Sequence, residues 1–450
     1  MKLARLSLVA ILVAGIGTTS FAADTLADAF KNGKIKGELR AWYFDKDTEK
    51  FNSSTAPTSV IKDAAKTGSI FDTAVILNYV TDALYGFTFG ATMQSSYSPF
   101  ANEEAKVTFK DDMYGSGAVL SEAYLGYKIK NTTAKIGRQF ISTPVVNGSG
   151  SRIVKESFEG ATIVNSDIPA TTVMAGFIDK FQGRTSAGMG AAEGDAPNFE
   201  KRAIFLGMSA STTYLFDDAY TLAVINKSIP NLTVTAQYAS ANDVNSGTNV
   251  KDVNMYYTEA SYLLPMNGFK LKFELNYRGS DTDLKITKSG VTTTFDGTQT
   301  AGRISLSELA GFGASLTAAT TSKDDAVISG MGNGASSWTA TLVKASSPSL
   351  RANTDSYRID VTYDFSKAGI SGLKGILQHG VANQDRVGSN PTSEDYSSYA
   401  VGVAYAVPAL KGLSLELQYE KQEIETTRYS NNTKFTADLD ELRFRANYKF

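Results

Sequence analysis

The chain has 450 residues, a formal net charge of −2 at pH 7, no cysteine and one histidine. This mildly acidic balance argues against nucleic acid as a partner, because domains that bind nucleic acid are basic. Without cysteine there can be no disulfide or thiolate metal site, and a single histidine excludes multi-histidine metal centres, so we expect neither metal nor cofactor.

The first 22 residues match the three-part pattern of a secretory signal peptide. Lys2 and Arg5 precede an apolar run from Leu6 to Ile16, and the segment ends at the small-residue site around Ala22. The run is shorter than the ~20 residues that a membrane-spanning helix needs. We expect cleavage near Ala22, which leaves residues 23–450 as a single domain, since no linker, charge block or composition shift divides them.

The rest of the chain predicts strands joined by turns that are alternately short and long. About ten alternating residues per segment, with this rhythm of connections, are typical of outer-membrane barrels. After a leader at 23–34, the expected strands are 35–41, 71–80, 85–95, 119–129, 133–141, 158–165, 171–181, 220–229, 232–240, 254–264, 269–279, 300–309, 313–321, 355–365, 373–383, 396–407, 413–424 and 438–450. These eighteen strands (or sixteen, since boundaries shift by about two to four residues) predict an all-β, transmembrane antiparallel β-barrel.

The strand expected at 269–279 indicates which face meets lipid. Apolar side chains from Phe269 to Tyr277 alternate with charged or polar ones from Lys270 to Arg278. An Arg or Lys on the lipid face costs ~2–4 kcal/mol at mid-membrane, so the charged side must face the interior. A barrel of this many strands is too wide for side chains to fill. The pattern therefore predicts a polar, water-filled channel.

The last ten residues alternate without interruption. We expect Arg443 and Arg445 to face solute, with Tyr448 and Phe450 on the lipid side. Tyr448 and Phe450 also fit the signal that barrel-assembly machinery reads in similar proteins, which predicts that machinery as a partner.

Several motifs resemble those of the OprD family of outer-membrane porins. They are Leu120–Tyr124, Lys135–Gln139, Thr143-Pro144, Gly150–Arg152, Phe158–Gly160 and Ala175-Gly176, with Glu38–Phe44 and Tyr448–Phe450 similar too. The leader is similar to that of epsilonproteobacterial, Campylobacter-type major outer-membrane porins. The resemblance implies an eighteen-stranded barrel in the outer membrane, commonly a homotrimer. It also implies passive diffusion of small hydrophilic solutes, often carboxylates or amino acids, past a third external loop folded into the lumen.

The resemblance places that loop at 142–157 and implies a basic ladder along the channel wall. Arg152 matches the family pattern, whereas Lys155 stands where a proline is expected. Arginines facing loop carboxylates would set up a transverse field at the narrowest point. Plain solvation of a wet wall is an equal alternative for each arginine. The candidate pore-lining and selectivity residues are Arg40, Arg152, Lys155, Glu156, Arg278, Arg303, Arg358, Arg443 and Arg445.

One arginine does not fit the predicted wall. Strict alternation turns Arg138 toward lipid, unless a β-bulge re-aims it or its strand lies in a subunit interface.

Other functions find less support in the sequence. The only histidine, His379, has no nearby nucleophile motif, so we expect no catalytic residues and disfavour a lipid-modifying barrel enzyme. An energy-coupled transporter needs an internal plug, which residues 23–34 are too few to form. A structural or adhesive role for the long loops stays open. Glu103-Glu104 and Asp111-Asp112 fit solvated loop charges better than a Ca²⁺ site.

Overall fold

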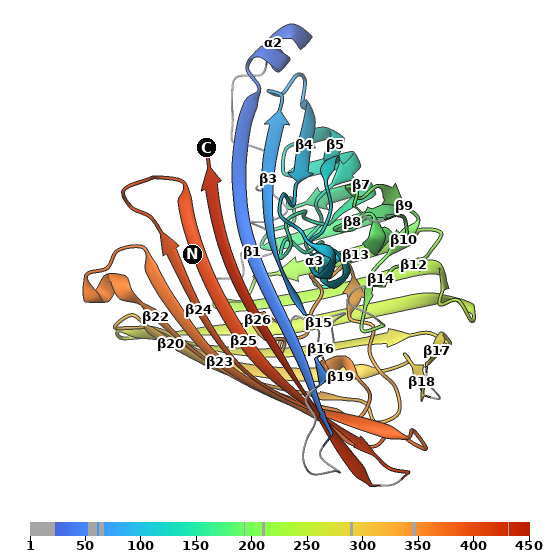
Figure 1. Ribbon diagram of the computed structural model, residues 1–450. Coiled ribbons are helices and arrows are strands. Elements are labelled where there is room, and N and C mark those ends of the chain that lie inside the picture. The colour runs from blue at the N-terminus through green and yellow to red at the C-terminus, as the bar shows by residue number, and fades with distance from the viewer. Residues whose placement is uncertain are drawn as a thin grey trace.

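The computed structural model describes residues 23–52, 61–62, 67–192, 194–208, 212–288, 291–343, 348–430 and 432–450. The expected signal peptide, residues 1–22, lies outside these ranges. Within them, eighteen antiparallel strands form one closed barrel, as predicted (Figure 1). None of the helices in the described part of the chain has the length and apolar character needed to cross a membrane.

The barrel strands follow one another around the wall in chain order. They are β1 (Lys34–Asn52), β3 (Gly68–Val80), β4 (Phe87–Ser96), β5 (Gly117–Ile129), β6 (Thr132–Gln139), β7 (Ser157–Asn165), β8 (Thr171–Gln182), β13 (Ala219–Asn226), β14 (Leu232–Asn245), β15 (Val250–Met266), β16 (Phe269–Asp281), β19 (Thr298–Leu309), β20 (Phe312–Thr321), β22 (Thr354–Asp364), β23 (Leu373–Gln384), β24 (Thr392–Ala406), β25 (Leu413–Arg428) and β26 (Thr433–Lys449).

The connections carry short elements. These are the helices α2 (Leu26–Lys31) and α3 (Glu103–Phe109), the 3₁₀ turns η2 (Ala187–Met189), η3 (Pro348–Leu350) and η4 (Phe365–Ala368), and the strands β2 (Ile61–Lys62), β9 (Phe199–Glu200), β10 (Arg202–Ala203), β11 (Phe205–Leu206), β12 (Tyr214–Leu215), β17 (Lys285–Lys288), β18 (Val291–Thr294) and β21 (Gly330–Met331). Four long connections matter below: loop 2 (97–116), loop 3 (140–156), loop 4 (183–218) and loop 7 (322–353).

The barrel closes because its last strand pairs with its first. The register of β26 on β1 runs from Glu38 opposite Lys449 to Asn52 opposite Phe435. β1 pairs with β3 on its other side, so no barrel strand leaves an open edge. All backbone groups in the wall can therefore be paired between strands, as hydrocarbon requires.

β1 extends well beyond the predicted 35–41. The aromatic run Trp42-Tyr43-Phe44 hides the alternation in the sequence, but Trp42 and Phe44 continue the inward face and are buried. Their rings stack with centroids 5.9 Å apart. Large inward aromatics are tolerated here because they pack against loops inside the barrel, which local periodicity does not reveal.

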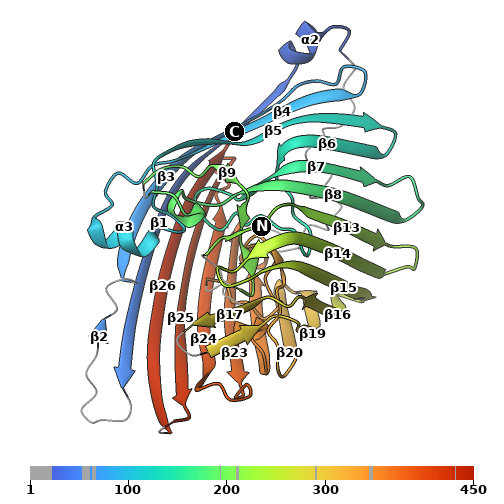
Figure 2. The ribbon, with the colours of Figure 1, turned by 90° about the vertical axis from the view of Figure 1, so that its right-hand side faces the viewer.

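Loop 3 connects β6 and β7, which have 8 and 9 residues and are among the shortest strands of the wall (Figure 2). Loop 4 contacts the strands on either side of this pair. Its residue Asp195 forms a β-bridge with Ser116, just before β5, and its strand β9 pairs with the end of β8. Arg138 in β6 keeps the outward direction of strict alternation, since Ile136 is exposed and Gln139 is buried. A register shift lies on the neighbouring β7–β8 pair instead.

Candidate functional site

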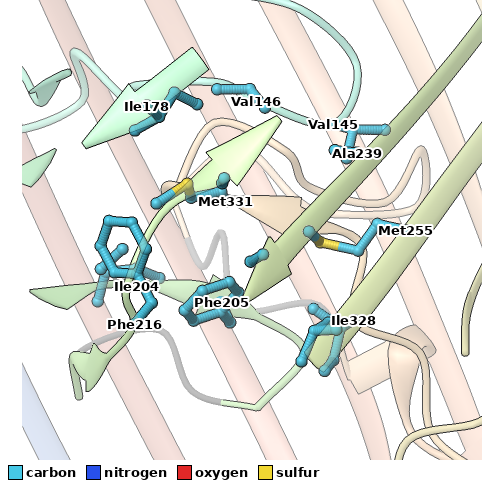
Figure 3. Close-up of a cluster of buried hydrophobic side chains, with 14 of the residues drawn as sticks. Val145, Val146, Ile178, Ile204, Phe205, Phe216, Ala239, Met255, Ile328 and Met331 are labelled. Carbon is cyan, nitrogen blue, oxygen red and sulfur yellow. The ribbon is translucent and has the colours of Figure 1, made fainter. Parts of the chain in front are cut away.

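Three loops meet inside the barrel. Loop 3 folds inward as predicted, and loops 4 and 7 join it. Strand β11 of loop 4 pairs with β21 of loop 7, and Val146 of loop 3 bridges Met331 of loop 7. Figure 3 shows apolar side chains from all three loops packed against Ile178, Ala239 and Met255 of the wall. The lumen is thus narrowed by a packed layer rather than by one loop.

The close contact between loops 3 and 7 depends on glycine. Gly332 has a φ of 86°, and a Cβ at this position would lie 2.4 Å from the carbonyl oxygen of Asn147. Only glycine fits both this backbone conformation and this contact. The side-chain amide of Asn147 donates to the carbonyl of Gly334 at 2.8 Å, which holds the two loops together.

Glu156, predicted to line the pore, is fully buried where the three loops meet. Its Oε2 accepts from the amides of Ser149 and Asn333, both at 2.9 Å. Its Oε1 accepts from Asn333 Nδ2 at 2.6 Å and lies 2.9 Å from Arg184 Nε. A buried carboxylate is tolerated only when it is paired in this way. Glu156 therefore braces loop 3 to loops 4 and 7.

Four predicted arginines gather beside Trp42 and Phe44. The guanidinium carbon of Arg445 lies 4.8 Å from the Trp42 ring centroid and 5.1 Å from that of Phe44. Arg443 and Arg152 lie 5.0 and 5.6 Å from the Phe44 ring, and Arg40 lies 5.1 Å from the Trp42 ring. Cations held over aromatic faces and away from water are stabilised by the ring quadrupole.

The same arginines fasten loop 3 to the wall. Arg40 Nη1 donates to the carbonyl of Ile153 at 2.8 Å, and Arg445 Nη2 donates to the carbonyl of Ser151 at 3.2 Å. Each arginine also has a carboxylate partner. The ion pairs are Arg40–Glu38 at 2.9 Å, Arg152–Asp112 at 2.8 Å, Arg443–Glu441 at 2.7 Å and Arg445–Glu416 at 3.4 Å.

Three other predicted arginines hold loop 7. Arg278 Nη1 donates to the carbonyls of Ala335 and Ser336 at 3.4 and 3.3 Å. Arg303 lies 4.6 Å from the Trp338 ring and pairs with Glu274 at 2.6 Å. Arg358 donates to the carbonyl of Ala340 and pairs with Asp360. The arginines thus form two groups, one beside loop 3 and one beside loop 7.

Lys155, which stands where a proline is expected, is held in loop 3 by hydrogen bonds to its backbone. The side chain of Gln94 accepts from its amide and donates to its carbonyl, both at 2.9 Å, and its ammonium lies 4.1 Å from the Phe140 ring. Tyr448 and Phe450 lie at the closing seam, their ring centroids 6.2 Å apart. Which of these residues set selectivity or assembly stays a prediction.

Sequence reasoning missed several anchors. Glu420 on β25 accepts from Thr341 Oγ1 at 2.6 Å and from the amide of Val343 at 2.8 Å, both in loop 7. Gln237 on β14 holds the tip of loop 3 through the amide of Val145 at 2.9 Å. The apolar residues in the long connection 322–353 could have indicated that loop 7 packs inside the barrel, because a solvated loop has no need of them.

Two open spaces flank the loop layer. A cavity of about 530 Å³ reaches the short-turn end of β13 and β14, where Lys227, Glu259, Lys272 and Trp338 are among its lining residues. A second cavity, of about 570 Å³, is lined by loops 4 and 7 together with 286 and 291–295 of the connection 282–297. Each cavity is lined by a mixture of polar and apolar side chains.

Asp112 of loop 2 is the charged partner of both Lys46 and Arg152, at 3.1 and 2.8 Å. Burial alone would raise the pKa of Asp112, but these two cations lower the pKa to about 2. This accounts for one of the loop acids considered for Ca²⁺. No cluster of potential metal ligands occurs within the described ranges.

Acidification should release this contact. The folded-state pKa lies below the ordinary 3.8, so the stabilisation is present above pH 3.8 and is lost as the pH falls toward 2. Its magnitude is about 2 kcal/mol. We expect loops 2 and 3 to become cleavable by an acid-active protease in that window. Asp112→Asn should remove the step, and an identical step in that variant would contradict the assignment.

Comparisons with known proteins give one consistent result. The model of the family described as outer membrane porin, OprD family, matches residues 28–450. The fold is similar to that of OpdQ from Pseudomonas aeruginosa, at 18% identity and a TM-score of 0.68 over 94% of this chain and 99% of that one. For OccK8 (OprE) and for OpdK with vanillate, both from that organism, identities are 16% and 13% and TM-scores 0.70 and 0.69, over the same shares. No curated protein sequence matches the chain.

Proposed function

The chain belongs to the OprD family of outer-membrane porins, so it is an outer-membrane channel and not an enzyme, and from that premise we propose that it admits small carboxylates and amino acids. The supporting observation is the gathering of arginines around the layer formed by loops 3, 4 and 7. Arg443 and Arg445 stand on the wall and Arg152 on loop 3, all within 5.6 Å of the Phe44 ring.

These arginines act on solute mainly through their field. Their side chains are only 3–10% exposed, so they are not free to bind a solute directly. Low-dielectric walls focus the potential of fixed charges into the open part of a channel. In the cavity of about 530 Å³, Lys227 and Lys272 suit a carboxylate, and Glu259 suits an ammonium group. A small zwitterion would satisfy both signs.

We propose three further features on the same basis. The protein is exported with a signal peptide that is cleaved near Ala22. Barrel-assembly machinery that reads Tyr448 and Phe450 inserts it into the outer membrane, where it functions as a homotrimer. The similarity of the leader to those of epsilonproteobacterial, Campylobacter-type porins supports the first. The solved relative OpdK has been described with vanillate, a carboxylate, which supports the solute class.

Reversal potential under a salt gradient tests this function. Purified protein in a planar bilayer should give stepwise conductance with a modest preference for anions, because the arginines stand beside the narrowed lumen. Lys227→Gln combined with Lys272→Gln should reduce that preference. Lys411→Gln, an exposed lysine in the turn after β24, should leave it unchanged. A strong cation preference in the unaltered protein would overturn the proposal.

A further inference from the structure

The leader, residues 23–34, is attached to the rim of the barrel at the end where β1 begins (Figures 1 and 2). Its helix α2 lies beside the short turn between β3 and β4. The amide of Asp82 in that turn donates to the carbonyl of Ala29 at 2.9 Å, and Ala29 is buried. The amide of Ala23 donates to the carbonyl of Ala83, also at 2.9 Å. The leader is therefore a fixed part of the rim.

The aromatic ring of Phe30 places α2 on the outer side of the wall. Its centroid lies 6.4 Å from those of Tyr79 and Phe89, and the Tyr79 hydroxyl donates to the Phe30 carbonyl. Tyr79 continues the outward face of β3, on which Val75 and Leu77 are 39% and 40% exposed. Because these side chains face lipid, α2 lies outside the lumen and takes no part in narrowing it.

Exposed apolar side chains of α2 extend this outward surface. Leu26 and Phe30 are 64% and 48% exposed, and residues four apart lie on the same side of a helix. On the adjoining strands β4 and β5, the outward rings of Phe87 and Tyr127 lie with their centroids 4.6 Å apart. These side chains form one surface, the leader patch, which comprises Leu26, Phe30, Tyr79, Phe87, Phe89 and Tyr127.

We propose that α2 is an interfacial anchor whose leader patch inserts among the headgroups of membrane phospholipids. In outer-membrane barrels the short turns face the periplasm, so the lipid concerned belongs to the inner leaflet. Aromatic side chains are favoured at this depth because one end of the side chain is apolar and the other is wet. The inference rests on the location of the family in the outer membrane and not on the proposed solutes.

Continuity with the lipid-facing wall identifies the occupant. Tyr79 of the leader patch is the next outward residue of β3 after the exposed Leu77, so the patch and the wall form one apolar surface. A protein bound to the patch would have to displace lipid from that wall. The two acidic and two basic residues of the leader balance each other, so attraction to the membrane is apolar rather than electrostatic. Helices of this kind lie in the plane of the membrane interface.

Fluorescence quenching in nanodiscs tests the anchor. Because the chain contains no cysteine, Leu26→Cys takes a single bimane label. Phospholipids brominated high on the acyl chain should quench this label strongly, and iodide in the buffer should quench it severalfold less than the same label at Lys411→Cys. Lys411 is the matched control, exposed in another short turn, and Leu275→Cys, outward on β16 and 58% exposed, is the lipid control. Iodide quenching as strong at Leu26→Cys as at Lys411→Cys would overturn the proposal.

Photo-cross-linking identifies what contacts the leader patch. A benzophenone attached to Leu26→Cys and irradiated in native outer membranes should give adducts with the mass of a phospholipid. Adducts with a protein in their place would refute the lipid assignment. Because Leu26 is largely exposed, the substitution should leave the heat-modifiable mobility of the barrel unchanged. Conductance would persist in either case, since α2 lies outside the lumen, so failure here is separable from failure of the channel function.

Discussion

Replacing Glu156 with alanine is expected to open the layer that narrows the lumen. The carboxylate belongs to loop 3, is fully buried, and contacts loop 7 through Asn333 and loop 4 through Arg184. Removing one partner of a buried ion pair costs about 3–5 kcal/mol, because the remaining charge is left without compensation. We expect a larger and noisier single-channel conductance, together with new protease cleavage in loop 7.

The control must separate the loss of a negative charge from the loss of the contacts that hold loop 3 to loops 4 and 7. Glu308→Gln removes a carboxylate from the end of β19, where it pairs with Lys270 far from the loops, and should leave conductance unchanged. Glu156→Gln keeps the shape and a hydrogen-bonding oxygen, so its effect should be smaller than that of alanine. Normal conductance in Glu156→Ala would mean that Arg278, Arg358 and Glu420 alone hold loop 7 against the wall.

The barrel could be predicted from the sequence because its causes are local. Strand alternation and the cost of charge in lipid identify the strands and their faces, as in β16, and the rhythm of turns gives their number. The predicted count and the inward third loop are confirmed. Even the puzzling direction of Arg138 followed from strict alternation, although its partner Glu159 could not be identified without the sheet register.

The loop layer could not be predicted because its contacts are distant in sequence and have no period. Glu156 lies in loop 3, yet its partner Asn333 is 177 positions away. The sequence predicts one ladder of arginines, but in the structure they contact two different loops. Arg445 donates to a carbonyl of loop 3, whereas Arg278 donates to carbonyls of loop 7. Loop 7 carries Trp338 and other apolar residues that are buried, but their spacing in the sequence does not predict which part of the wall they contact.

Deleting Phe450 is expected to impair assembly far more than conductance. Its amide donates to the carbonyl of Gly37 at 3.0 Å and its carbonyl accepts from the amide of Gly37 at 2.9 Å, so it completes the pairing of the last strand with the first. Its ring lies over Gly37, where a Cβ would come within 2.2 Å of the ring. Loss of these contacts weakens the seam at which the barrel closes, and we expect severalfold less folded, heat-modifiable protein in the outer membrane.

Two variants distinguish this role from that of an ordinary interfacial aromatic. Phe312→Ala removes another exposed aromatic beside a short turn, at the start of β20, and should assemble almost normally. Phe450→Tyr keeps the ring and both backbone bonds to Gly37, so it should assemble like the unaltered protein. Molecules of the deletion variant that do reach the membrane should conduct normally, because Phe450 points outward and away from the loop layer. Full assembly of the deletion variant would show that pairing of β26 from Lys449 onward is enough to close the barrel.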